Sequence, residues 1–159
     1  VSTQEPRKNY QRLIKAYQKS CVDMELVIVG KVGWGEEMGK VENVRRLGFV
    51  PDEDLVGIWQ SAQALLYPSL YEGFGLPILQ SFKLDVPVLT SNLGSMKEIA
   101  GDAAILVDPY DENSIANGIK NIVKLMGKER KGLVEKGSKR EKDFSWKKAA
   151  TETLKLYEN

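Results

Sequence analysis

The stretch ALLYPSLYEGFGLPILQSFK, residues 64–83, predicts a strand, a short loop and a helix in direct succession. Four apolar residues precede Pro68, which has no N–H group to donate to a sheet and therefore ends the strand. The loop EGFG spans residues 72–75, and Pro77 suits the first turn of a helix, where its missing N–H removes no helical hydrogen bond. A strand followed closely by a helix is typical of α/β proteins.

Further strands and helices alternate on both sides of this unit. Apolar and β-branched runs predict strands within residues 25–30, 43–50, 64–68, 87–91 and 103–108. Helical spacing predicts helices over residues 10–20, 51–62, 76–83, 111–126 and 144–157, with a loosely joined helical stretch over 127–140. This alternation predicts an α/β fold with a single Rossmann-like, doubly wound parallel sheet.

The composition predicts one globular domain and excludes several kinds of chemistry. The chain has 159 residues, of which 42% are hydrophobic and 28% charged, and it carries a formal net charge of +1. It contains no histidine, which excludes Ser-His-Asp and Cys-His catalysis and histidine-bound metals within this chain. Its single cysteine excludes an internal disulfide framework and a multi-cysteine zinc site.

No segment of the sequence predicts a membrane span or a secretion signal. The longest unbroken apolar run is AAILV, residues 103–107, far shorter than the roughly 20 residues that a spanning helix needs. No basic-then-apolar segment opens the chain. We expect a soluble, cytoplasmic protein.

Positive charge gathers toward the C-terminus. Residues 120–159 contain 12 Lys and Arg against 6 Asp and Glu, whereas residues 1–119 contain 11 against 16. One interpretation is a solvated helical tail. The other is a tail that contacts an acidic surface or anionic lipid head groups, which would make the protein peripheral to a membrane. The balanced total charge argues against nucleic acid as a partner.

The glycine-containing loop at residues 72–75 is a candidate anion site. Glycines let a ligand approach the backbone closely, and the free N–H groups and dipole of a helix start favour a phosphate. The loop also follows the carboxyl end of a predicted strand, where open α/β sheets place their ligands. A tight structural turn is the alternative interpretation of the same glycines.

The segments YPSLYEGFGLPILQ (67–80) and PVLTSNLGSMKEIAGDAAILVDPYD (87–111) together resemble the C-terminal domain of family-four retaining glycosyltransferases, also called glycosyl transferases group 1. These enzymes have the two-domain GT-B architecture. Other matching segments follow in family order along essentially the whole chain: EPRKN (5–9), LVIVGKVGWG (26–35), VRRLGFVPDEDL (44–55) and FSWKKAATETLKLY (144–157).

The resemblance implies catalytic roles for three charged residues. Glu72 takes the place of the family's first motif glutamate, which meets hydroxyls of the donor sugar, and a carboxylate accepts strong bonds from such hydroxyls. Lys8 matches the phosphate-binding lysine. Arg7 would supply the second cation, as in the family branch that reads EPRKN, because Thr3 stands where the usual arginine lies. The alternative for each is a solvated residue.

The resemblance also implies donor-binding roles for two backbone segments. The N–H groups of Gly73, Phe74, Gly75 and Leu76 would hold the diphosphate and the sugar. Gly48, Val50, Pro51 and Asp52 match the segment that borders the nucleotide base. Phe49, between them, is either part of this border or a core residue. Lys31 and Trp34 would line the cleft, although Trp34 also suits structural packing.

The sequence departs from the family pattern at two positions. Gln80 stands where the second motif glutamate holds the ribose, which changes how the nucleotide would be bound. Asp85 replaces a glycine after the helix, so we expect a left-handed backbone there at a modest cost in stability.

The resemblance implies a domain that binds a nucleoside-diphosphate sugar, without a metal or cofactor, and passes a hexose to an acceptor hydroxyl with retention. Residues 1–159 would form this C-terminal domain, with its first strand truncated and the N-terminal acceptor domain absent. We therefore expect the chain alone to bind nucleotide weakly and to transfer nothing. Two alternatives stay open: a related enzyme such as a nucleotide-sugar epimerase or a phosphorylase, and a non-catalytic binding module.

The closing helix is expected to be capped by Ser145 and to carry an apolar stripe that includes Trp146 and Tyr157. In the family this helix returns to the N-terminal domain. Without that domain, part of the stripe should be exposed or should contact a partner chain.

Overall fold

The computed structural model describes residues 3–31, 33 and 39–157. The strands are β1 (Leu26–Val29), β2 (Val44–Gly48), β3 (Leu65–Tyr67), β4 (Val88–Ser91) and β5 (Ile105–Val107). The helices are a short 3-10 turn η1 (Pro6–Lys8), α1 (Tyr10–Ser20), α2 (Asp52–Ser61), α3 (Leu76–Lys83), α4 (Gly94–Ala100), α5 (Glu112–Lys124), α6 (Gly127–Glu141) and α7 (Trp146–Tyr157). The predicted α/β class is confirmed.

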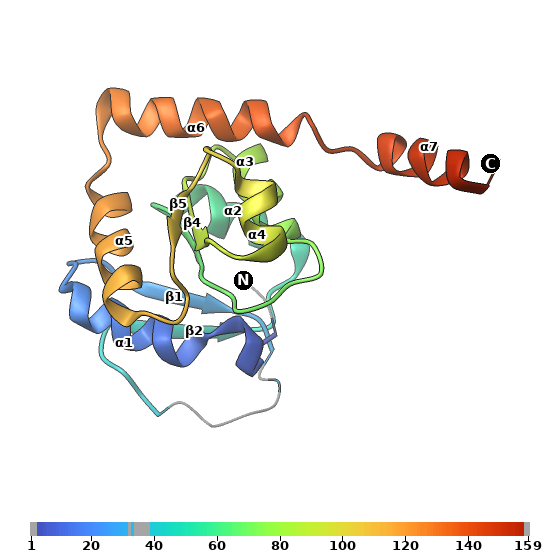
Figure 1. The fold of residues 1–159 in the computed structure, drawn as a ribbon. Helices are drawn as coiled ribbons and strands as arrows, with labels where there is room; N and C mark the ends of the chain where they lie inside the picture. The colour runs from blue at the N-terminus through green and yellow to red at the C-terminus, as the bar shows by residue number, and fades with distance from the viewer. Residues whose placement is uncertain (1–2, 32, 34–38, 158–159) are drawn as a thin grey trace.

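The strands pair in parallel and form two groups. β1 pairs with β2, with Leu26 opposite Val44. β3 pairs with β4, and β4 pairs with β5, so that β4 is the central strand of its group. The sequence predicted one continuous sheet, whereas among the described residues the two groups are separate, with β1 and β3 each paired on one side. Figure 1 shows the helices arranged around both groups.

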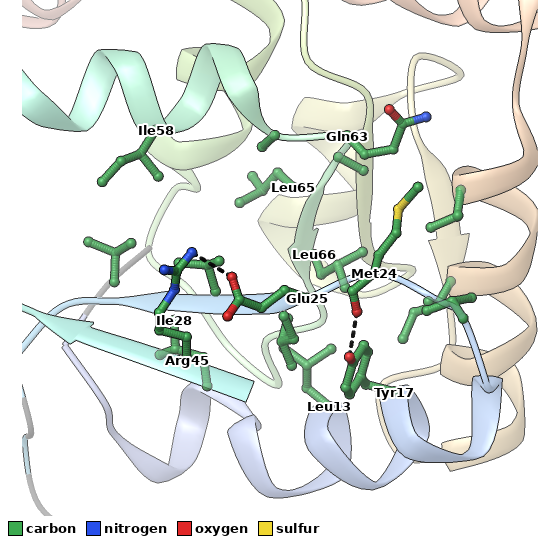
Figure 2. Close-up of a pocket in the computed structure, with 18 of the residues that line it drawn as sticks. Leu13, Tyr17, Met24, Glu25, Ile28, Arg45, Ile58, Gln63, Leu65 and Leu66 are labelled. Carbon is green, nitrogen blue, oxygen red and sulfur yellow. Dashed lines mark hydrogen bonds and ion pairs between the residues drawn. The ribbon is translucent and has the colours of Figure 1, made fainter. Parts of the chain in front are cut away.

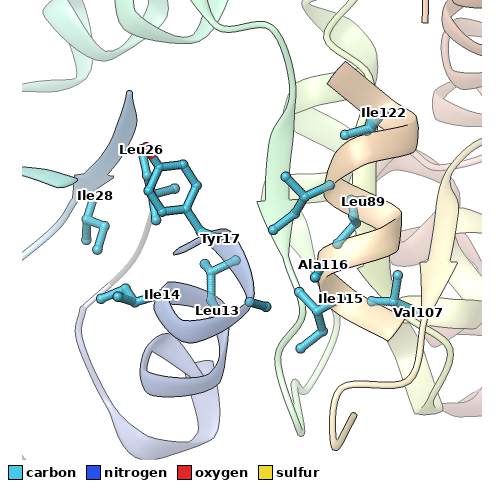
Figure 3. Close-up of a cluster of buried hydrophobic side chains, with 12 residues drawn as sticks. Leu13, Ile14, Tyr17, Leu26, Ile28, Leu89, Val107, Ile115, Ala116 and Ile122 are labelled. Carbon is cyan, nitrogen blue, oxygen red and sulfur yellow. The ribbon is translucent and has the colours of Figure 1, made fainter. Parts of the chain in front are cut away.

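One hydrophobic cluster joins α1 and α5 to the sheets (Figure 3). Leu13 of α1 and Ile115 of α5 are almost fully buried in it, together with Leu89 of β4. Gly118 lets α5 lie this close to the sheet, because a Cβ atom there would be 2.5 Å from a methyl carbon of Val107. A second cluster packs α2, α3 and α4 around β3 and β4, and its buried members include Trp59, Ile78 and Phe82.

The α-helix predictions succeed with one omission. α1 and α3 have the predicted bounds, and the helical stretch predicted over residues 127–140 is present as α6. The seven-residue helix α4 was not predicted. It begins at Gly94 and is too short for its spacing to be recognised as a helical period.

The left-handed backbone expected at Asp85 is confirmed by its φ of 57°. The Ser138 hydroxyl of α6 donates a hydrogen bond of 2.7 Å to the Asp85 carboxylate. This contact ties the turn after α3 to α6 and offsets part of the backbone strain.

The C-terminal helices behave differently from each other. α6 packs on α3 and donates from Arg130 to the Gln63 carbonyl and from Arg140 to the Ile99 carbonyl. Part of the positive charge of the tail therefore binds the domain itself. α7 extends away from the domain (Figure 1), and the Ser145 hydroxyl accepts from the Lys148 N–H, which confirms the predicted cap. Trp146 is 82% exposed, as expected for the unpartnered stripe. None of the helices described is long and apolar enough to cross a membrane.

Candidate functional site

The segment before α1 is bound to the carboxyl ends of three strands. The Gln4 N–H donates to the Lys31 carbonyl, just beyond β1, at 2.9 Å. The Asn9 side-chain amide donates to the Pro68 carbonyl at 3.0 Å and to the Pro109 carbonyl at 2.7 Å, just beyond β3 and β5. These contacts place the segment across the edge of the sheets where ligands bind in α/β proteins.

Two cations of this segment meet one carboxylate of the loop after β3. The Lys8 ammonium donates to Glu72 Oε1 at 2.7 Å and to the Tyr67 hydroxyl at 3.0 Å. The Arg7 guanidinium pairs with the other Glu72 oxygen, Oε2, and its Nε donates to Glu5 at 2.8 Å. The structure therefore brings together the three residues predicted to be catalytic, although Glu72 lies 65 positions from Arg7 and 64 from Lys8 in the sequence.

The members of this charged cluster differ in their exposure. The side chains of Lys8 and Glu72 are 9% and 7% exposed, whereas the Arg7 side chain is 41% exposed. An anion arriving from solvent can therefore reach Arg7 without first displacing the other two side chains. The Ser95 hydroxyl donates to the Glu72 carbonyl at 2.9 Å and so fixes the loop to α4.

Burial and hydrogen bonding act on Glu72 in opposite directions. Burial alone would raise the pKa of its carboxyl group, but the hydrogen bond and the positive charge of Lys8 outweigh burial and hold the pKa below its usual value. Burial and the adjacent Glu72 carboxylate raise the pKa of Tyr67 well above its usual value. Glu72 is thus a carboxylate at neutral pH, and Tyr67 keeps its proton.

The loop leads into α3 through a glycine that the backbone requires. Gly75 has a φ of 123°, and a Cβ atom there would lie 3.3 Å from the side chain of Ile78. Gly75 caps α3 without a side-chain hydrogen bond, so the N–H groups that begin at Leu76 receive no side-chain acceptor from the cap. Gly73 is exposed, and the ring of Phe74 meets that of Phe144 edge to face at 5.9 Å.

The predicted base-binding segment follows β2 at the same edge of the domain. Gly48 ends the strand with a φ of 69°, Val50 is half-buried, and Pro51 and Asp52 begin the exposed first turn of α2. Phe49 is 67% exposed, so the interpretation of Phe49 as a core residue is wrong.

Three further candidates from the sequence are Lys31, Trp34 and Gln80. The Lys31 ammonium lies 5.2 Å from the centre of the Phe49 ring, so Lys31 stands beside the base-binding segment. Trp34 lies outside the described residues. Gln80 is exposed in the second turn of α3, one helical turn beyond Leu76.

The local sequence patterns do not indicate Tyr67 and Asn9 as parts of this site. Tyr67 is 4% exposed and Asn9 is also 4% exposed. A buried tyrosine at the end of an apolar strand needs a partner for its hydroxyl, which was the available signal. For Asn9 the signal was weaker, since asparagine is common before helices and its φ of 62° appears only in the folded chain.

The geometry of a metal centre does not appear among residues 3–31, 33 and 39–157: the acidic side chains and the cysteine nowhere gather into a group of three or more that could hold an ion. The polar chemistry of the site is instead that of two cations, one carboxylate and a helix start.

Residues 1–140 match the family described as Glycosyl transferases group 1, and the chain belongs to this family. It is 37% identical over 169 residues to the O-antigen chain mannosyltransferase B of Escherichia coli, covering 99% of this chain and 44% of that protein. It is 30% identical over 171 residues to the MMP alpha-(1->4)-mannosyltransferase of Mycolicibacterium hassiacum, covering 99% of this chain and 41% of that protein. The chain thus spans less than half the length of these relatives.

Solved structures show the same fold. Anabaena Alr3699/HepE, determined in complex with UDP and glucose, superposes with a TM-score of 0.82 at 20% identity, covering 98% of this chain and 47% of that one. Sucrose-phosphate synthase from Thermosynechococcus elongatus superposes with a TM-score of 0.80 at 24% identity, covering 97% of this chain and 42% of that one. The fold is the C-terminal, Rossmann-like half of the GT-B architecture.

Proposed function

We propose that this chain is the donor-binding domain of a retaining glycosyltransferase, which moves a hexose from a nucleoside-diphosphate sugar to an acceptor hydroxyl. The observation that supports this most directly is the cluster of Arg7, Lys8 and Glu72 beside the start of α3. The family membership and the mannosyltransferase names of the relatives at 37% and 30% identity are consistent with it. They also favour mannose as the transferred sugar.

The two cations suit the leaving group of this reaction. Breaking the sugar–phosphate bond leaves negative charge on a nucleoside diphosphate, and preorganised cations and helix N–H groups stabilise such charge as it develops. Arg7 is the more exposed cation and would contact the diphosphate first. Lys8, held by Tyr67 and Glu72, would present a fixed charge beside it. No metal ion or other cofactor is needed for this role.

Glu72 would bind the sugar. Its carboxylate can accept hydrogen bonds from sugar hydroxyls, and its lowered pKa keeps it ionised for that purpose. In the arrangement described, Glu72 already accepts from both cations. Donor binding would therefore redistribute these bonds. The two cations would then also bind the diphosphate, and the carboxylate would also accept hydrogen bonds from the sugar hydroxyls.

The remaining donor contacts would come from the backbone. Gly73, Phe74, Gly75 and Leu76 would offer N–H groups to the diphosphate and sugar, and Gln80 would face the ribose. Gly48, Val50, Pro51 and Asp52 would border the base. Retention would follow from attack on the same face as the departing phosphate, whose oxygen would accept the proton of the acceptor hydroxyl.

The acceptor would be bound by another domain of a longer polypeptide. The relatives extend well beyond the region matched by this chain, which fits a two-domain enzyme. One domain supplies a single wall of an interdomain cleft, so the chain alone should bind nucleotide weakly and transfer no sugar. The exposed stripe of α7, with Trp146 and Tyr157, would contact the same additional domain.

Calorimetric titration of the chain tests the donor role. We expect binding of GDP and UDP to be measurable, with the matching nucleoside weaker, because the diphosphate meets Arg7 and Lys8. Arg7→Ala should weaken diphosphate binding about tenfold, which corresponds to roughly 1.4 kcal/mol, and leave nucleoside binding unchanged. Lys15→Ala is the matched control, because Lys15 is an exposed cation on the neighbouring helix α1.

The outcomes separate the candidate functions. If GDP- or UDP-linked mannose binds more tightly than the corresponding glucose donor in competition experiments, mannose is supported as the transferred sugar. If Arg7→Ala weakens binding of the diphosphate and of the nucleoside equally, Arg7 does not contact the phosphate. No affinity for any nucleoside diphosphate would instead favour a non-catalytic module, to which the departure at Gln80 gives some support.

A further inference from the structure

The loop before α3 carries a single side chain between two glycines. Residues 73–75, which we call the donor loop, follow Glu72 and lead into α3. Gly73 and Gly75 have no side chain, and a glycine backbone adopts many conformations at little cost. A Cβ atom at Gly73 would meet nothing within 4 Å, so this part of the loop is open. The contacts of Phe74 therefore do much to determine how the N–H groups of the donor loop lie.

The ring of Phe74 packs on Phe144, in the segment between α6 and α7. The two ring centres are 5.9 Å apart, and the rings meet edge to face at 84°. An edge-to-face aromatic pair shifts an equilibrium by roughly twofold to tenfold. Phe74 is 44% exposed even with this contact, so the domain does not otherwise enclose its ring.

Arg140, near the end of α6, holds Phe144 against the domain. The central carbon of its guanidinium lies 4.9 Å from the centre of the Phe144 ring. The same guanidinium donates to the carbonyls of Ile99 at 3.1 Å and Glu98 at 2.8 Å, in α4, and to the Asp143 carboxylate at 2.9 Å. Phe144 also packs against the second hydrophobic cluster. Its position is therefore fixed relative to α4 and α6.

The donor loop lies between α4 and Phe144. At the start of the loop, the Ser95 hydroxyl donates to the Glu72 carbonyl at 2.9 Å. At its end, a Cβ atom on Gly75 would lie 3.5 Å from the side chain of Ile99. The guanidinium that binds the α4 carbonyls also covers the Phe144 ring, so the two supports of the loop are joined to each other.

α7 begins directly beyond this contact. The Phe144 N–H donates to the Glu141 carbonyl at 3.0 Å, and Ser145 caps α7. α7 has no buried residue and extends away from the domain (Figure 1). A change in the direction of α7 must therefore be absorbed at residues 142–145, beside the ring that supports the donor loop.

We propose that Phe144 is a positioning residue for the donor loop and that, through Phe74, it couples the position of α7 to the affinity of the loop for a diphosphate. This inference rests on the proposed donor-binding function, because it assigns the N–H groups of the loop to a diphosphate. While Phe144 packs on Phe74, these groups are held in one arrangement before the anion arrives. Without that contact the loop adopts several arrangements, and the apparent affinity falls by the fraction that can bind.

Calorimetric titration with GDP, UDP and the matching nucleosides tests the positioning role. Phe144→Ala should weaken diphosphate binding about threefold to tenfold and leave nucleoside binding unchanged, because the base-binding segment after β2 does not depend on this ring. Phe144→Tyr keeps the ring and should bind like the unaltered chain. Met126→Ala is the matched control, because Met126 is an apolar side chain, 76% exposed, at the opposite end of α6.

A double-mutant cycle tests whether the effect passes through Phe74. Phe74→Ala removes the same contact from the side of the loop. The protein with both substitutions should therefore bind the diphosphate no more weakly than the weaker of the two single variants. If Phe144→Ala does not fold, as judged by circular dichroism, Phe144→Leu keeps apolar volume without the ring and takes its place in the cycle.

Hydrogen exchange tests the coupling from the side of α7. Saturating GDP or UDP should slow exchange of the Phe144 amide in the unaltered chain and not in Phe74→Ala, because coupling between two sites is reciprocal. With no ligand present, Phe74→Ala should speed exchange of that amide about twofold to tenfold. The amide of Ile119, in the buried face of α5, is the control and should not change.

Three results would overturn the proposal. The first is an equal loss of diphosphate and nucleoside binding in Phe144→Ala, or no loss of either. The second is a pair of losses that add in the double variant. The third is a Phe144 amide whose exchange ignores Phe74→Ala. A chain that binds neither GDP nor UDP would instead overturn the proposed function and the diphosphate part of this proposal, and the ligand-free exchange would still decide whether Phe144 holds the loop.

Discussion

Replacing Lys8 with methionine should destabilise the domain in a pH-dependent way. Lys8→Met keeps an unbranched apolar side chain of similar length and removes the ammonium group. Glu72 then loses a hydrogen bond of 2.7 Å, and the Tyr67 hydroxyl loses one of 3.0 Å. The side chains of Lys8 and Glu72 are 9% and 7% exposed, so water cannot fully replace the lost donor.

The expected loss in the free energy of unfolding depends on the contacts that Glu72 keeps in Lys8→Met. Removing one partner of a buried ion pair costs about 3–5 kcal/mol when the other charge is left without compensation. Here the Arg7 guanidinium stays beside Glu72, so about half of that, near 2 kcal/mol, is expected. For a chain of this length the loss lowers the melting temperature by roughly 4–8 °C.

The loss should shrink at low pH. The pKa of Glu72 is lowered in the folded protein relative to 4.5. A carboxyl group with a lowered folded pKa contributes stability that is present above its unfolded pKa and disappears as the pH falls through the folded pKa. The difference between the two proteins should therefore be largest above about pH 4.5 and narrow below the folded pKa, where Glu72 is protonated in both.

Thermal denaturation at about pH 7 and about pH 3, with GDP and UDP absent, measures this difference. Lys15→Met is the matched control, because Lys15 is 66% exposed and its nearest carboxylate oxygen, on Glu112, is 3.9 Å away. We expect Lys15→Met to lower the free energy of unfolding by less than about 1 kcal/mol. A Lys8→Met loss no larger than the control, or one that is the same at both pH values, would refute this account of the buried pair.

Three other substitutions test the site. Tyr67→Phe should lower the free energy of unfolding by about 0.5–1.5 kcal/mol by removing the acceptor of the Lys8 bond, measured by urea denaturation. Gly75→Ala should lower the free energy of unfolding by about 1–3 kcal/mol, because Gly75 has a positive φ and a Cβ there would lie 3.3 Å from the side chain of Ile78. Gly73→Ala is the control and should change little in the same assay, because a Cβ there meets nothing within 4 Å. Gln80→Glu should tighten binding of a nucleoside diphosphate about tenfold and leave a 2′,3′-dideoxy analogue unaffected in calorimetry; an equal gain for both ligands would argue against a ribose contact.

The sequence determined the secondary structure wherever the signal was local. The spacing of apolar residues predicts α1 and α3 with the bounds that the structure has. The pattern of strand, EGFG loop and helix likewise predicts the crossing at residues 67–76, because Pro68, Gly75 and Pro77 each restrict the backbone on their own. The cap at Ser145 and the left-handed Asp85 are local features of the same kind.

The sequence also contained the charged candidates, but their geometry depends on tertiary structure. The resemblance to a known family indicated Lys8 and Glu72 as separate groups, one for phosphate and one for sugar. Their direct ion pair spans 64 positions of the chain and exists only because residues 4–9 are bound across the ends of the strands. The hydroxyl of Tyr67 joins that pair for the same reason, and the local pattern around Tyr67 indicates only a strand.

Strand pairing and the exposure of individual residues depend on contacts between distant parts of the chain, so they become clear only in the folded protein. Hydrophobic runs indicate strands, but the pairing of a parallel strand depends on neighbours that lie far apart in the sequence. The cavity between β1 and β3 (Figure 2) is lined by two such strands, and no single segment of the sequence specifies it. The exposure of Phe49 was undecided for the same reason, because an aromatic side chain after a strand is buried only if another element covers it.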